Sequence, residues 1–272
     1  MERNREEGWQ YAKLSGHKNE DLITQLVQSD ESIQSKLVEF AKKTGRIIGV
    51  AEGGLCETSI PSVLGDSTKS KPDLKLKLDN GQKINISIKK SWGGQVFLIT
   101  PDRFIRGFEK QYGKVIPQDV KRAIGLFWGS EDDTLEIIRD YAQIEKDYQT
   151  RKHRLVKDTM DKYNPQLSHI LITWFKENII EIFDFCFVRG LALNQEDWAD
   201  ILWYKNLLEA DDDDIDELFS IEELKQKIGK RTDLIVYGTR TGGSTIQLPF
   251  GFVQWHQNSL QFHHKLCNLL SL

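Results

Sequence analysis

The sequence predicts a mixed α/β fold, in which a central mixed β-sheet is flanked by helices and a β-rich region follows toward the C-terminus. Three observations support this class: an apolar helical stripe near the N-terminus, two alternating strands joined through Asn80-Gly81, and short strand-like runs between glycine-rich turns after residue 230. Apolar residues recur every three or four positions in amphipathic helices and every second position in half-buried strands. The chain shows both periods.

The N-terminal part predicts a helix, a strand and a long loop. Helical periodicity runs from Asn19 to Lys43, and Thr44-Gly45 ends it. The apolar run Ile47–Ala51 then indicates a buried strand. Residues 52–72 are rich in Gly, Ser, Thr, Pro and Lys, which is typical of a loop. Loops of this length inside a compact domain usually have a function.

Two strands are predicted on either side of Asn80-Gly81, over Leu74–Leu78 and Gln82–Ile88. Both runs alternate apolar and polar residues, so each strand has one apolar and one polar face. A two-residue Asn-Gly loop would set Lys77 opposite Ile84 and mix the two faces. A half-buried sheet does not tolerate this mixture.

A three-residue loop over residues 79–81 resolves the conflict. With Gly81 in the left-handed region this is a common hairpin type, and the apolar faces of the two strands then agree. The same register places Asp73 directly opposite Ser87, with Lys89 next along the polar face. Burial of the apolar faces and the meeting of Asp73, Ser87 and Lys89 on the polar face therefore favour the register with the three-residue loop.

The remaining patterns predict elements that alternate between helices and strands. In chain order they are a strand at Val96–Ile99, helices near 102–112, 117–128 and 132–162, a helix from Pro165 to about Asn178, strands at Ile179–Val188 and Trp198–Tyr204, a helix near 220–228, and strands at Leu234–Tyr237, Thr245–Leu248 and Leu260–His263.

Composition indicates a globular protein without a membrane segment. The 272 residues are 39% hydrophobic and 29% charged, and no apolar run reaches the roughly 20 residues that span a bilayer. The N-terminus is too polar for a secretory signal. The three cysteines form no CxxC pair and are expected to be buried thiols in a reducing compartment. We therefore expect a cytoplasmic protein.

The charge is unevenly distributed along the chain. The formal net charge is −4, yet residues 209–223 carry nine acids and no base, whereas Lys69–Arg122 carries thirteen bases and five acids. This pattern is compatible with a positive cleft for nucleic acid beside an acidic outer face. Solvated surface charge explains it equally well, and the role of the acidic segment stays open.

An aspartate and a lysine that converge on one strand face suit the hydrolysis of a phosphodiester. The carboxylate can bind Mg²⁺, with Mn²⁺ as a substitute, and the metal lowers the pKa of an attacking water. The lysine can orient that water or stabilise charge in the transition state. A solvated strand face with alternating Asp and Lys is the alternative.

Pro72-Asp73 followed by Ser87-Ile88-Lys89 resembles the signature of the PD-(D/E)xK type II restriction endonucleases, except that Ser87 occupies the acidic position. This departure resembles the small MspI/HinPI-like group, which also carries a neutral polar residue there. Further similarities follow the same order along the chain: His17–Asp21, Ser87–Trp92, Ile182–Gly190 and Leu260-Gln261-Phe262.

The resemblance implies a restriction-endonuclease-like fold and a monomeric enzyme that cuts double-stranded DNA at a short sequence with Mg²⁺. It implies that Asp73 is a metal ligand, that Lys89 is the catalytic lysine, and that Ser87 replaces the acid. The backbone carbonyl of Ile88 would be a further metal ligand. Glu20 in the first helix would supply the missing carboxylate, although a glutamate there also suits the helix dipole. Glu52, after the first strand, is the competing carboxylate.

Candidate DNA-reading residues follow from the chemistry of base edges, because Arg pairs with guanine and Asn or Gln with adenine. We expect two groups to contact DNA, and solvated turns are the alternative for both. Near the C-terminus they are Thr239, Arg240, Thr241, Ser244, Gln254, Gln257, Asn258 and Gln261. Near the catalytic strand they are Ser91, Trp92 and Gln95, and the helix face of Arg103 and Arg106 is expected to hold phosphates.

The predicted organisation is a catalytic core over residues 1–130 and a DNA-recognition region over residues 131–272, or one compact unit. His256, His263 and His264 lack the partners of a closed zinc site, so no zinc is assigned. Three functions stay open: a type II restriction endonuclease, a repair or recombination nuclease on the same core, and an inactive DNA-binding module in which Ser87 marks a lost site.

Overall fold

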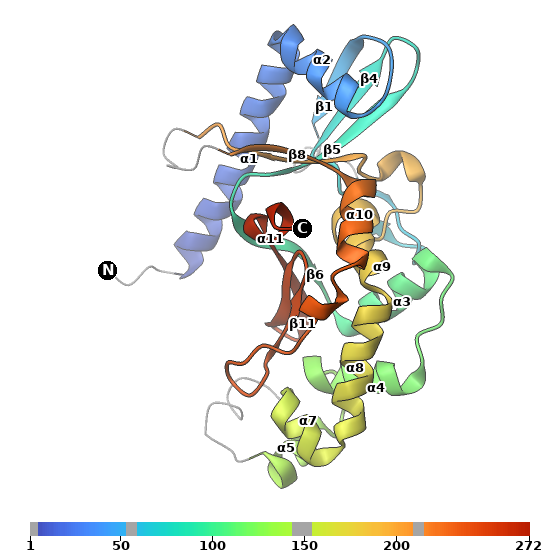
Figure 1. The fold of residues 1–272 in the computed structure, drawn as a ribbon, viewed down its shortest axis with the longest axis vertical. Coiled ribbons are helices and arrows are strands. Elements are labelled where there is room, and N and C mark those ends of the chain that lie inside the picture. The colour runs from blue at the N-terminus through green and yellow to red at the C-terminus, as the bar shows by residue number, and fades with distance from the viewer. Residues whose placement is uncertain (1–4, 53–58, 143–153, 209–214) are drawn as a thin grey trace. The chain divides into compact units, whose positions relative to one another are not determined.

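The computed structural model describes residues 5–52, 59–142, 154–208 and 215–272, with the side chains of residues 5–15 and of Glu52 outside the description. The chain forms two compact units (Figure 1). Unit 1 comprises residues 1–91 and 187–224, and unit 2 comprises residues 92–186 and 225–272. The units interleave along the chain.

Unit 1 contains a mixed five-stranded sheet in the order β1-β4-β5-β7-β8. Its strands are β1 (Ile47–Glu52), β4 (Leu74–Leu78), β5 (Lys83–Lys89), β7 (Ile201–Lys205) and β8 (Asp216–Ser220). Only β5 and β7 run parallel, and the other pairs are antiparallel. A parallel pair requires a long crossover. The whole of residues 92–186 lies in that crossover, which explains why the units interleave.

The hairpin β4–β5 has the register that the sequence predicts. Leu74 pairs with Ile86 and Leu76 with Ile84. Gly81 has a φ of +84°, and the Leu78 N–H donates to the Gln82 carbonyl at 2.8 Å. Five apolar side chains of the two strands therefore point into one core: Leu74, Leu76, Leu78, Ile84 and Ile86 are each at most 1% exposed.

Two helices cover this apolar face, α1 (Arg5–Ser29) and α2 (Glu31–Phe40). Ile23, Val27 and Leu37 pack into the same cluster as the hairpin. The prediction of one helix over 19–43 was wrong at Asp30, whose carboxylate accepts from the Ser32 and Ile33 N–H groups and starts a second helix. Asp at such a position satisfies N–H groups that a new helix leaves without partners.

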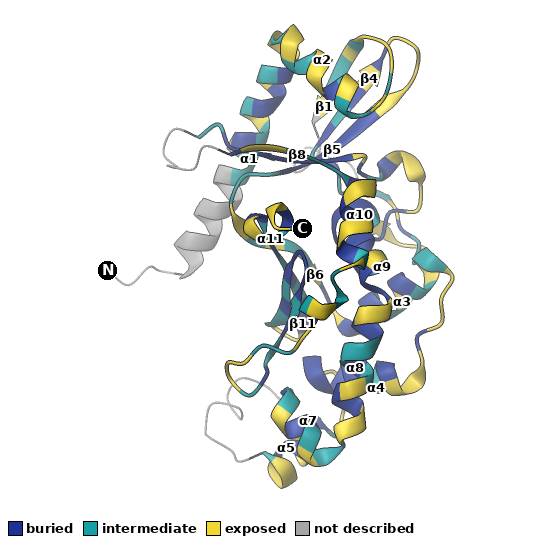
Figure 2. Cartoon of the chain, viewed as in Figure 1, coloured by how far each residue is buried: buried dark blue, intermediate teal, exposed yellow. Residues whose placement is uncertain are grey.

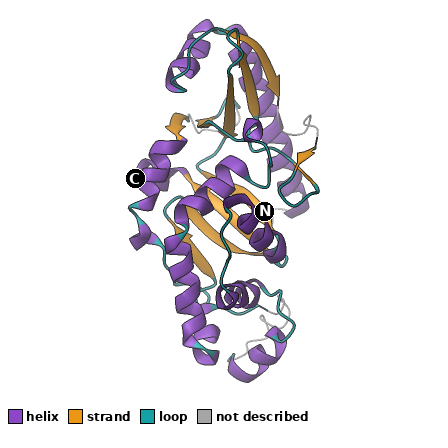
Figure 3. Cartoon of the chain, turned by 90° about the vertical axis from the view of Figure 1, so that its right-hand side faces the viewer, coloured by secondary structure: helices purple, strands orange, loops and turns teal. Residues whose placement is uncertain are grey.

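Unit 2 contains an antiparallel four-stranded sheet in the order β6-β11-β10-β9. Its strands are β6 (Gly93–Ile99), β9 (Thr245–Leu248), β10 (Gly251–His256) and β11 (Ser259–Lys265) (Figure 3). Val253, Leu260 and Phe262 are buried, whereas alternate residues on the same strands are partly exposed (Figure 2). The C-terminal β-rich region is thus confirmed, and together with the mixed sheet of unit 1 it confirms the predicted α/β class.

Unit 2 also contains helices, and the first of them packs on the buried face of this sheet. They are α3 (Pro101–Tyr112), α4 (Gln118–Trp128), α5 (Thr134–Tyr141), α7 (Lys157–Tyr163), α8 (Pro165–Glu177) and α9 (Ile179–Asp184), with α11 (Leu266–Leu270) at the end of the chain. Phe104 of α3 contacts Phe262 of β11, with ring centroids 5.8 Å apart. The predicted helices near 102–112, 117–128 and 165–178 are confirmed.

The predicted strand at Ile179–Val188 is wrong, because the segment forms α9 and a π-helical turn over Phe185–Arg189. Ile179, Ile182, Phe183, Phe185 and Cys186 are all at most 2% exposed. A helix buried on most sides has no polar stripe. Its apolar run cannot be distinguished from a buried strand by periodicity.

Two other predicted segments differ from the structure, and two match an observed element. The helix predicted over 132–162 is α5 and α7, and residues 143–153 between them lie outside the description. The strand predicted at Leu234–Tyr237 is a 3-10 turn over Thr232–Leu234 with a single bridge from Tyr237 to Ile246. The strand Trp198–Tyr204 is β7, and the helix near 220–228 is α10 (Ile221–Gly229).

Two sequence-based expectations concern thiols and membranes. Cys186 is buried as expected, whereas Cys267 is exposed, which corrects the expectation for that residue; Cys56 lies outside the described residues. No helix within the described parts of the chain is long and apolar enough to cross a membrane.

Candidate active site

Asp73, Ser87 and Lys89 come together on the polar face of the β4–β5 hairpin. The Asp73 N–H donates to the Ile86 carbonyl at 2.8 Å, which extends the ladder by one residue and sets Asp73 opposite Ser87. Because side chains alternate along a strand, Ser87 and Lys89 project to the same face. The side chains of Lys89 and Asp73 are 17% and 21% exposed, so the cluster is only partly open to solvent.

One carboxylate oxygen of Asp73, Oδ2, faces every hydrogen-bond donor that contacts this side chain in the described part of the chain. Asp73 Oδ2 accepts from the Ile88 N–H at 2.6 Å and from Ser87 Oγ at 3.3 Å, and Lys89 Nζ lies 3.5 Å away. Asp73 Oδ1 accepts no hydrogen bond from the described residues. One oxygen of the carboxylate is therefore held by the protein and the other is available to a ligand.

Lys89 Nζ is fixed by three oxygens. It donates to Ser87 Oγ at 2.8 Å and to the Ile88 carbonyl at 2.7 Å, and it faces Asp73 Oδ2. Ser87 is 2% exposed and contacts both charged partners. The serine at the position of the expected acid thus joins Asp73 to Lys89 and adds no negative charge.

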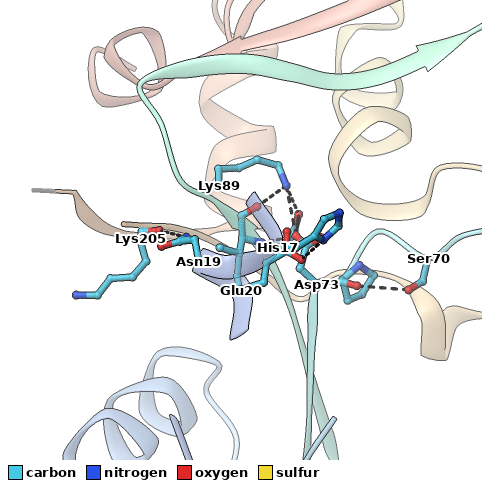
Figure 4. Close-up of polar contacts among 10 residues, drawn as sticks. His17, Asn19, Glu20, Ser70, Asp73, Lys89 and Lys205 are labelled. Atoms are coloured by element: carbon cyan, nitrogen blue, oxygen red, sulfur yellow. Dashed lines mark hydrogen bonds and ion pairs between the residues drawn. The ribbon is translucent and has the colours of Figure 1, made fainter. Parts of the chain in front are cut away.

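Helix α1 brings Glu20 toward this end of the sheet. Asn19, fully buried, donates to the Lys205 carbonyl at 2.8 Å and accepts from the Leu207 N–H at 2.8 Å, which fixes α1 at the end of β7. In the parallel pair β5–β7, Lys89 lies opposite Tyr204, the residue before Lys205. Glu20 pairs with His17 at 3.3 Å, and Figure 4 draws this pair together with Asp73 and Lys89.

Glu52, the competing carboxylate, ends strand β1. Its backbone lies opposite Leu74, the residue after Asp73. Its side chain lies outside the description. The structure thus places both glutamates on elements that adjoin the cluster, and it gives contacts only for Glu20.

The candidate metal ligands at the cluster are oxygen atoms, which Mg²⁺ prefers. They are Asp73 Oδ1, the Ile88 carbonyl and the carboxylate of Glu20. Mg²⁺ is commonly bound by one or two carboxylates, with water and substrate phosphate completing its shell. Within the described residues no group of three or more His, Cys, Asp or Glu side chains forms a metal cage. The donor set therefore fits a metal that shares its ligands with substrate.

Lys71 packs against Gly190 near the site, a contact that the sequence does not predict. Gly190 has a φ of +54°, and a Cβ there would lie 2.9 Å from Lys71 Cε. The absence of a side chain at Gly190 thus leaves room for the Lys71 stem, two residues before Asp73. The glycine that ends the apolar run at 182–190 was the available signal.

The predicted DNA-contacting residues, apart from Ser91 of unit 1, all lie in unit 2 and occupy several places. Gln257 and Asn258 form the two-residue turn between β10 and β11, with φ values of 47° and 58°. Thr239, Arg240 and Thr241 are exposed in a separate turn, and Ser244 follows it. That turn is attached to α7, because Asp158 N–H donates to the Gly242 carbonyl at 3.1 Å.

Gln95, Gln254 and Gln261 form a continuous cluster, here called the amide face. Gln254 Nε2 donates to Gln261 Oε1 at 2.8 Å, and Gln261 Nε2 donates to Gln95 Oε1 at 2.7 Å. These three residues lie on neighbouring strands and project away from the buried side chains of Val253 and Phe262. The structure thus joins three predicted residues that are distant in sequence.

Arg103 and Arg106 do not join the amide face. They belong to α3, whose Phe104 packs on Phe262, on the opposite face of the sheet. Arg106 also pairs with Asp102 at 3.3 Å. Trp92, 46% exposed, is held through its carbonyl, which accepts from the Leu266 N–H at 2.7 Å.

Asp216, in the described part of the acidic segment, is paired with a base of its own unit. Asp216 accepts from Trp203 Nε1 and from Lys205 Nζ, both at 2.8 Å. Burial raises the pKa of Asp216, but these hydrogen bonds and the nearby lysines outweigh it, so that the pKa lies below its ordinary value of 3.8. Residues 209–214 lie outside the description.

Comparison with known proteins gives a distant likeness in structure. No protein-family model and no curated protein matches the chain. Among solved structures, the restriction endonuclease MspI in complex with its cognate DNA is similar at a TM-score of 0.45 and 13% sequence identity. The match covers 85% of this chain and 77% of that chain. A likeness at this level assigns no function.

Proposed function

We propose that this protein is a Mg²⁺-dependent endonuclease that hydrolyses duplex DNA at a short specific sequence, as type II restriction endonucleases do. The observation that carries the proposal is the cluster of Asp73, Ser87 and Lys89 on one sheet face. It combines a carboxylate oxygen open to a ligand with a positive charge held by three oxygens. The restriction-endonuclease-like fold and the PD-(D/E)xK class belong to the same proposal.

Lys89 is the residue we assign to the reacting phosphate. Its ammonium is mostly shielded from solvent, and its contacts with Ser87 Oγ and the Ile88 carbonyl fix its position before substrate binds. A positioned charge in a partly desolvated site stabilises developing negative charge without the cost of reorganisation. It can also orient the attacking water by a hydrogen bond.

The residues that would hold the metal are Asp73, through Oδ1, and Ile88, through its carbonyl, with Glu20 or Glu52 as the second carboxylate. When bound, Mg²⁺ supplies charge neutralisation at the phosphate and lowers the pKa of a coordinated water. Ser87 leaves the cluster one carboxylate short of the PD-(D/E)xK pattern. The protein therefore depends on a glutamate from another element.

The amide face and the β10–β11 turn are the surfaces we assign to sequence reading. Asn and Gln side chains can form paired hydrogen bonds with base edges, whereas contacts with phosphates fix position without reading sequence. The exposed Arg240 is suited to guanine, and Gln257 and Asn258 project from the turn. The hydrogen-bonding chemistry of these side chains and their exposure to solvent together support the assignment to base reading.

Cleavage of a supercoiled plasmid by the full-length chain tests the proposal. With Mg²⁺ we expect defined linear fragments. Asp73→Asn should abolish cleavage, because it removes the charge that holds the metal, while DNA binding measured by fluorescence anisotropy in Ca²⁺ persists. Asp132→Asn is a matched control, because Asp132 is exposed and belongs to unit 2, outside the cluster.

Three outcomes would contradict parts of the proposal. No cleavage with Mg²⁺ or Mn²⁺, from protein that still binds DNA, would favour an inactive binding module. Random nicking, or a preference for mismatches or flaps, would favour a repair nuclease. Full activity of Asp73→Asn would remove the assigned site altogether.

A further inference from the structure

The outward face of the four-stranded sheet carries a histidine beside the amide face. His263 lies on β11 two residues after Gln261, so the two share a face by strand alternation. His263 stacks on Phe252 of β10, with ring centroids 4.6 Å apart and planes 4° from parallel. The imidazole is therefore held in a fixed plane at one end of the amide face.

His263 also ends a line of hydrogen bonds. Gln254 Nε2 lies 3.3 Å from His263 Nε2, and the same amide nitrogen donates to Gln261 Oε1 at 2.8 Å. Gln261 Nε2 then donates to Gln95 Oε1 at 2.7 Å. The four side chains form one chain of donors and acceptors across β10, β11 and β6, here called the amide chain.

The amide chain can run in only two directions. A glutamine amide has an acceptor at Oε1 and donors at Nε2, so each contact needs an oxygen facing a nitrogen. If Gln254 turns its amide over, it presents Oε1 to Gln261, which must then donate through Nε2. Gln261 in turn presents Oε1 to Gln95. Reversal of one amide requires reversal of all three.

Protonation of His263 restricts the direction. A neutral imidazole that carries its proton on Nδ1 accepts through Nε2 and matches the donating nitrogen of Gln254, so the observed direction requires this neutral tautomer. An imidazolium donates from both ring nitrogens and requires an oxygen there. The side chain is half-buried, and this burial together with the nearby His256 lowers the pKa of His263 below its ordinary value of 6.5. Lys265, whose ammonium lies 5.3 Å from the Phe252 ring, is another positive charge on this face.

We propose that His263 sets the direction of the amide chain and thereby determines which donor and acceptor atoms this face presents to the base edges of duplex DNA. The proposal rests on the proposed function, because DNA is the ligand assigned there. With neutral His263, Gln254 presents its Oε1 as an acceptor and Gln95 presents its Nε2 as a donor. With protonated His263, Gln254 presents a donor and Gln95 an acceptor.

This reversal changes what the face can read. An acceptor suits the amino groups of cytosine N4 or adenine N6, and a donor suits guanine O6 or N7 or adenine N7. Base preference at the positions facing Gln254 and Gln95 should therefore change as His263 takes up a proton. His263 acts through the amides in this account and is a positioning residue for specificity.

The first experiment follows the amide chain without DNA. In full-length protein labelled with ¹⁵N at glutamine and histidine, the side-chain NH₂ signals of Gln254, Gln261 and Gln95 should titrate with the midpoint of the His263 imidazole. Gln261→Met removes the middle link, so the titration shift of Gln95 should fall several-fold. Gln247→Met is the matched control, since Gln247 contacts Thr245 on its own strand, β9, and lies outside the amide chain.

The second experiment measures base preference. A pool of duplexes with a randomised segment is cut with Mg²⁺ at pH values on either side of the His263 midpoint, and the fragment ends are sequenced. The wild type and Gln247→Met should change their preference at one or more base pairs by about tenfold, which is near the discrimination of one good hydrogen-bonded pair. Gln261→Met should show the same preference at both pH values.

The outcomes separate the two proposals. An unshifted Gln95 signal in the wild type, or an equal shift in Gln261→Met, would overturn the coupled chain. A chain that reverses without any change in base preference would overturn its role in reading. No cleavage of the pool at either pH would overturn the nuclease proposal and with it the DNA ligand, while the first experiment would still decide whether the chain exists.

Discussion

Two hairpins of this protein share an architecture and differ in chemistry. The β4–β5 hairpin of unit 1 and the β10–β11 hairpin of unit 2 each have one apolar, buried face and one polar face. The polar face of β4–β5 gathers charges, with Lys89 Nζ 3.5 Å from Asp73 Oδ2. The polar face of β10–β11 carries neutral amides that are hydrogen-bonded one to the next.

The difference between the two hairpins corresponds to two requirements of a DNA ligand, hydrolysis of its backbone and reading of its bases. Hydrolysis of a phosphodiester requires charge at the reacting atoms, and it acts on any base sequence. Base reading requires neutral donors and acceptors in fixed directions, because a misplaced donor leaves a base edge unpaired. A change in one hairpin should therefore affect rate, and a change in the other should affect sequence preference.

Lys89→Met should give a large loss of cleavage activity. Removal of the fixed charge should lower single-turnover cleavage by roughly 10²- to 10³-fold, as for other transition-state donors. The sequence preference of the residual cleavage should stay unchanged. Lys77→Met, on the exposed part of the same strand pair, is the control and should cut normally. Altered preference in Lys89→Met would contradict the separation of tasks.

Alanine at the hairpin glycines should destabilise the two hairpins unequally. At Gly251 a Cβ would lie 2.0 Å from the His263 carbonyl oxygen, so Gly251→Ala should cost about 3 kcal/mol of unfolding free energy. At Gly81 nothing lies within 4 Å, and only the left-handed backbone opposes alanine, at about 1 kcal/mol. Urea denaturation of both variants measures the difference, and equal losses would contradict it.

Ser87→Ala should have an intermediate effect on catalysis. The hydroxyl joins Asp73 to Lys89, and loss of such an orienting contact typically lowers activity about 10- to 100-fold. Ser87→Thr keeps the hydroxyl and should retain more activity than alanine. Single-turnover rates at saturating Mg²⁺ make the comparison. Wild-type activity of Ser87→Ala would show that the serine only fills the position of the acid.

Acid should weaken the two units in different pH ranges, with a small effect for each group. The pKa of His263 is lower in the folded chain, so the unfolded state binds more protons and stability falls as pH falls below about 6.5. The pKa of Asp216 is also lowered, so its contribution is lost only as pH falls below about 3.8. Hydrogen exchange of the two sheets should show unit 2 weakening first. Simultaneous loss would contradict this order.

The sequence predicted the β4–β5 hairpin because all its determinants are local. The alternating runs, residues 79–81 and the left-handed Gly81 together fix one register, and that register places Asp73 beside Ser87. The break at Asp30 was also encoded locally, as an N-cap, but the apolar stripe continued across it and concealed the new helix start.

Features that depend on distant pairings could not be read from the sequence. Gln95 and Gln261 are 166 residues apart, and their contact depends on a β6–β11 register that shifts at Phe262 and His263. The helix α9 was mistaken for a strand because its residues are buried on most sides. The interleaved units follow from the parallel β5–β7 pair, which joins segments more than a hundred residues apart.

Fragment-end mapping of a DNA genome of known sequence, digested with Mg²⁺ by the protein, tests whether Asp73 belongs to a sequence-specific nuclease site. We expect ends that share one short sequence and that disappear in Asp73→Asn. Ends scattered without a common sequence, or an intact genome after incubation with folded protein and metal, would contradict it.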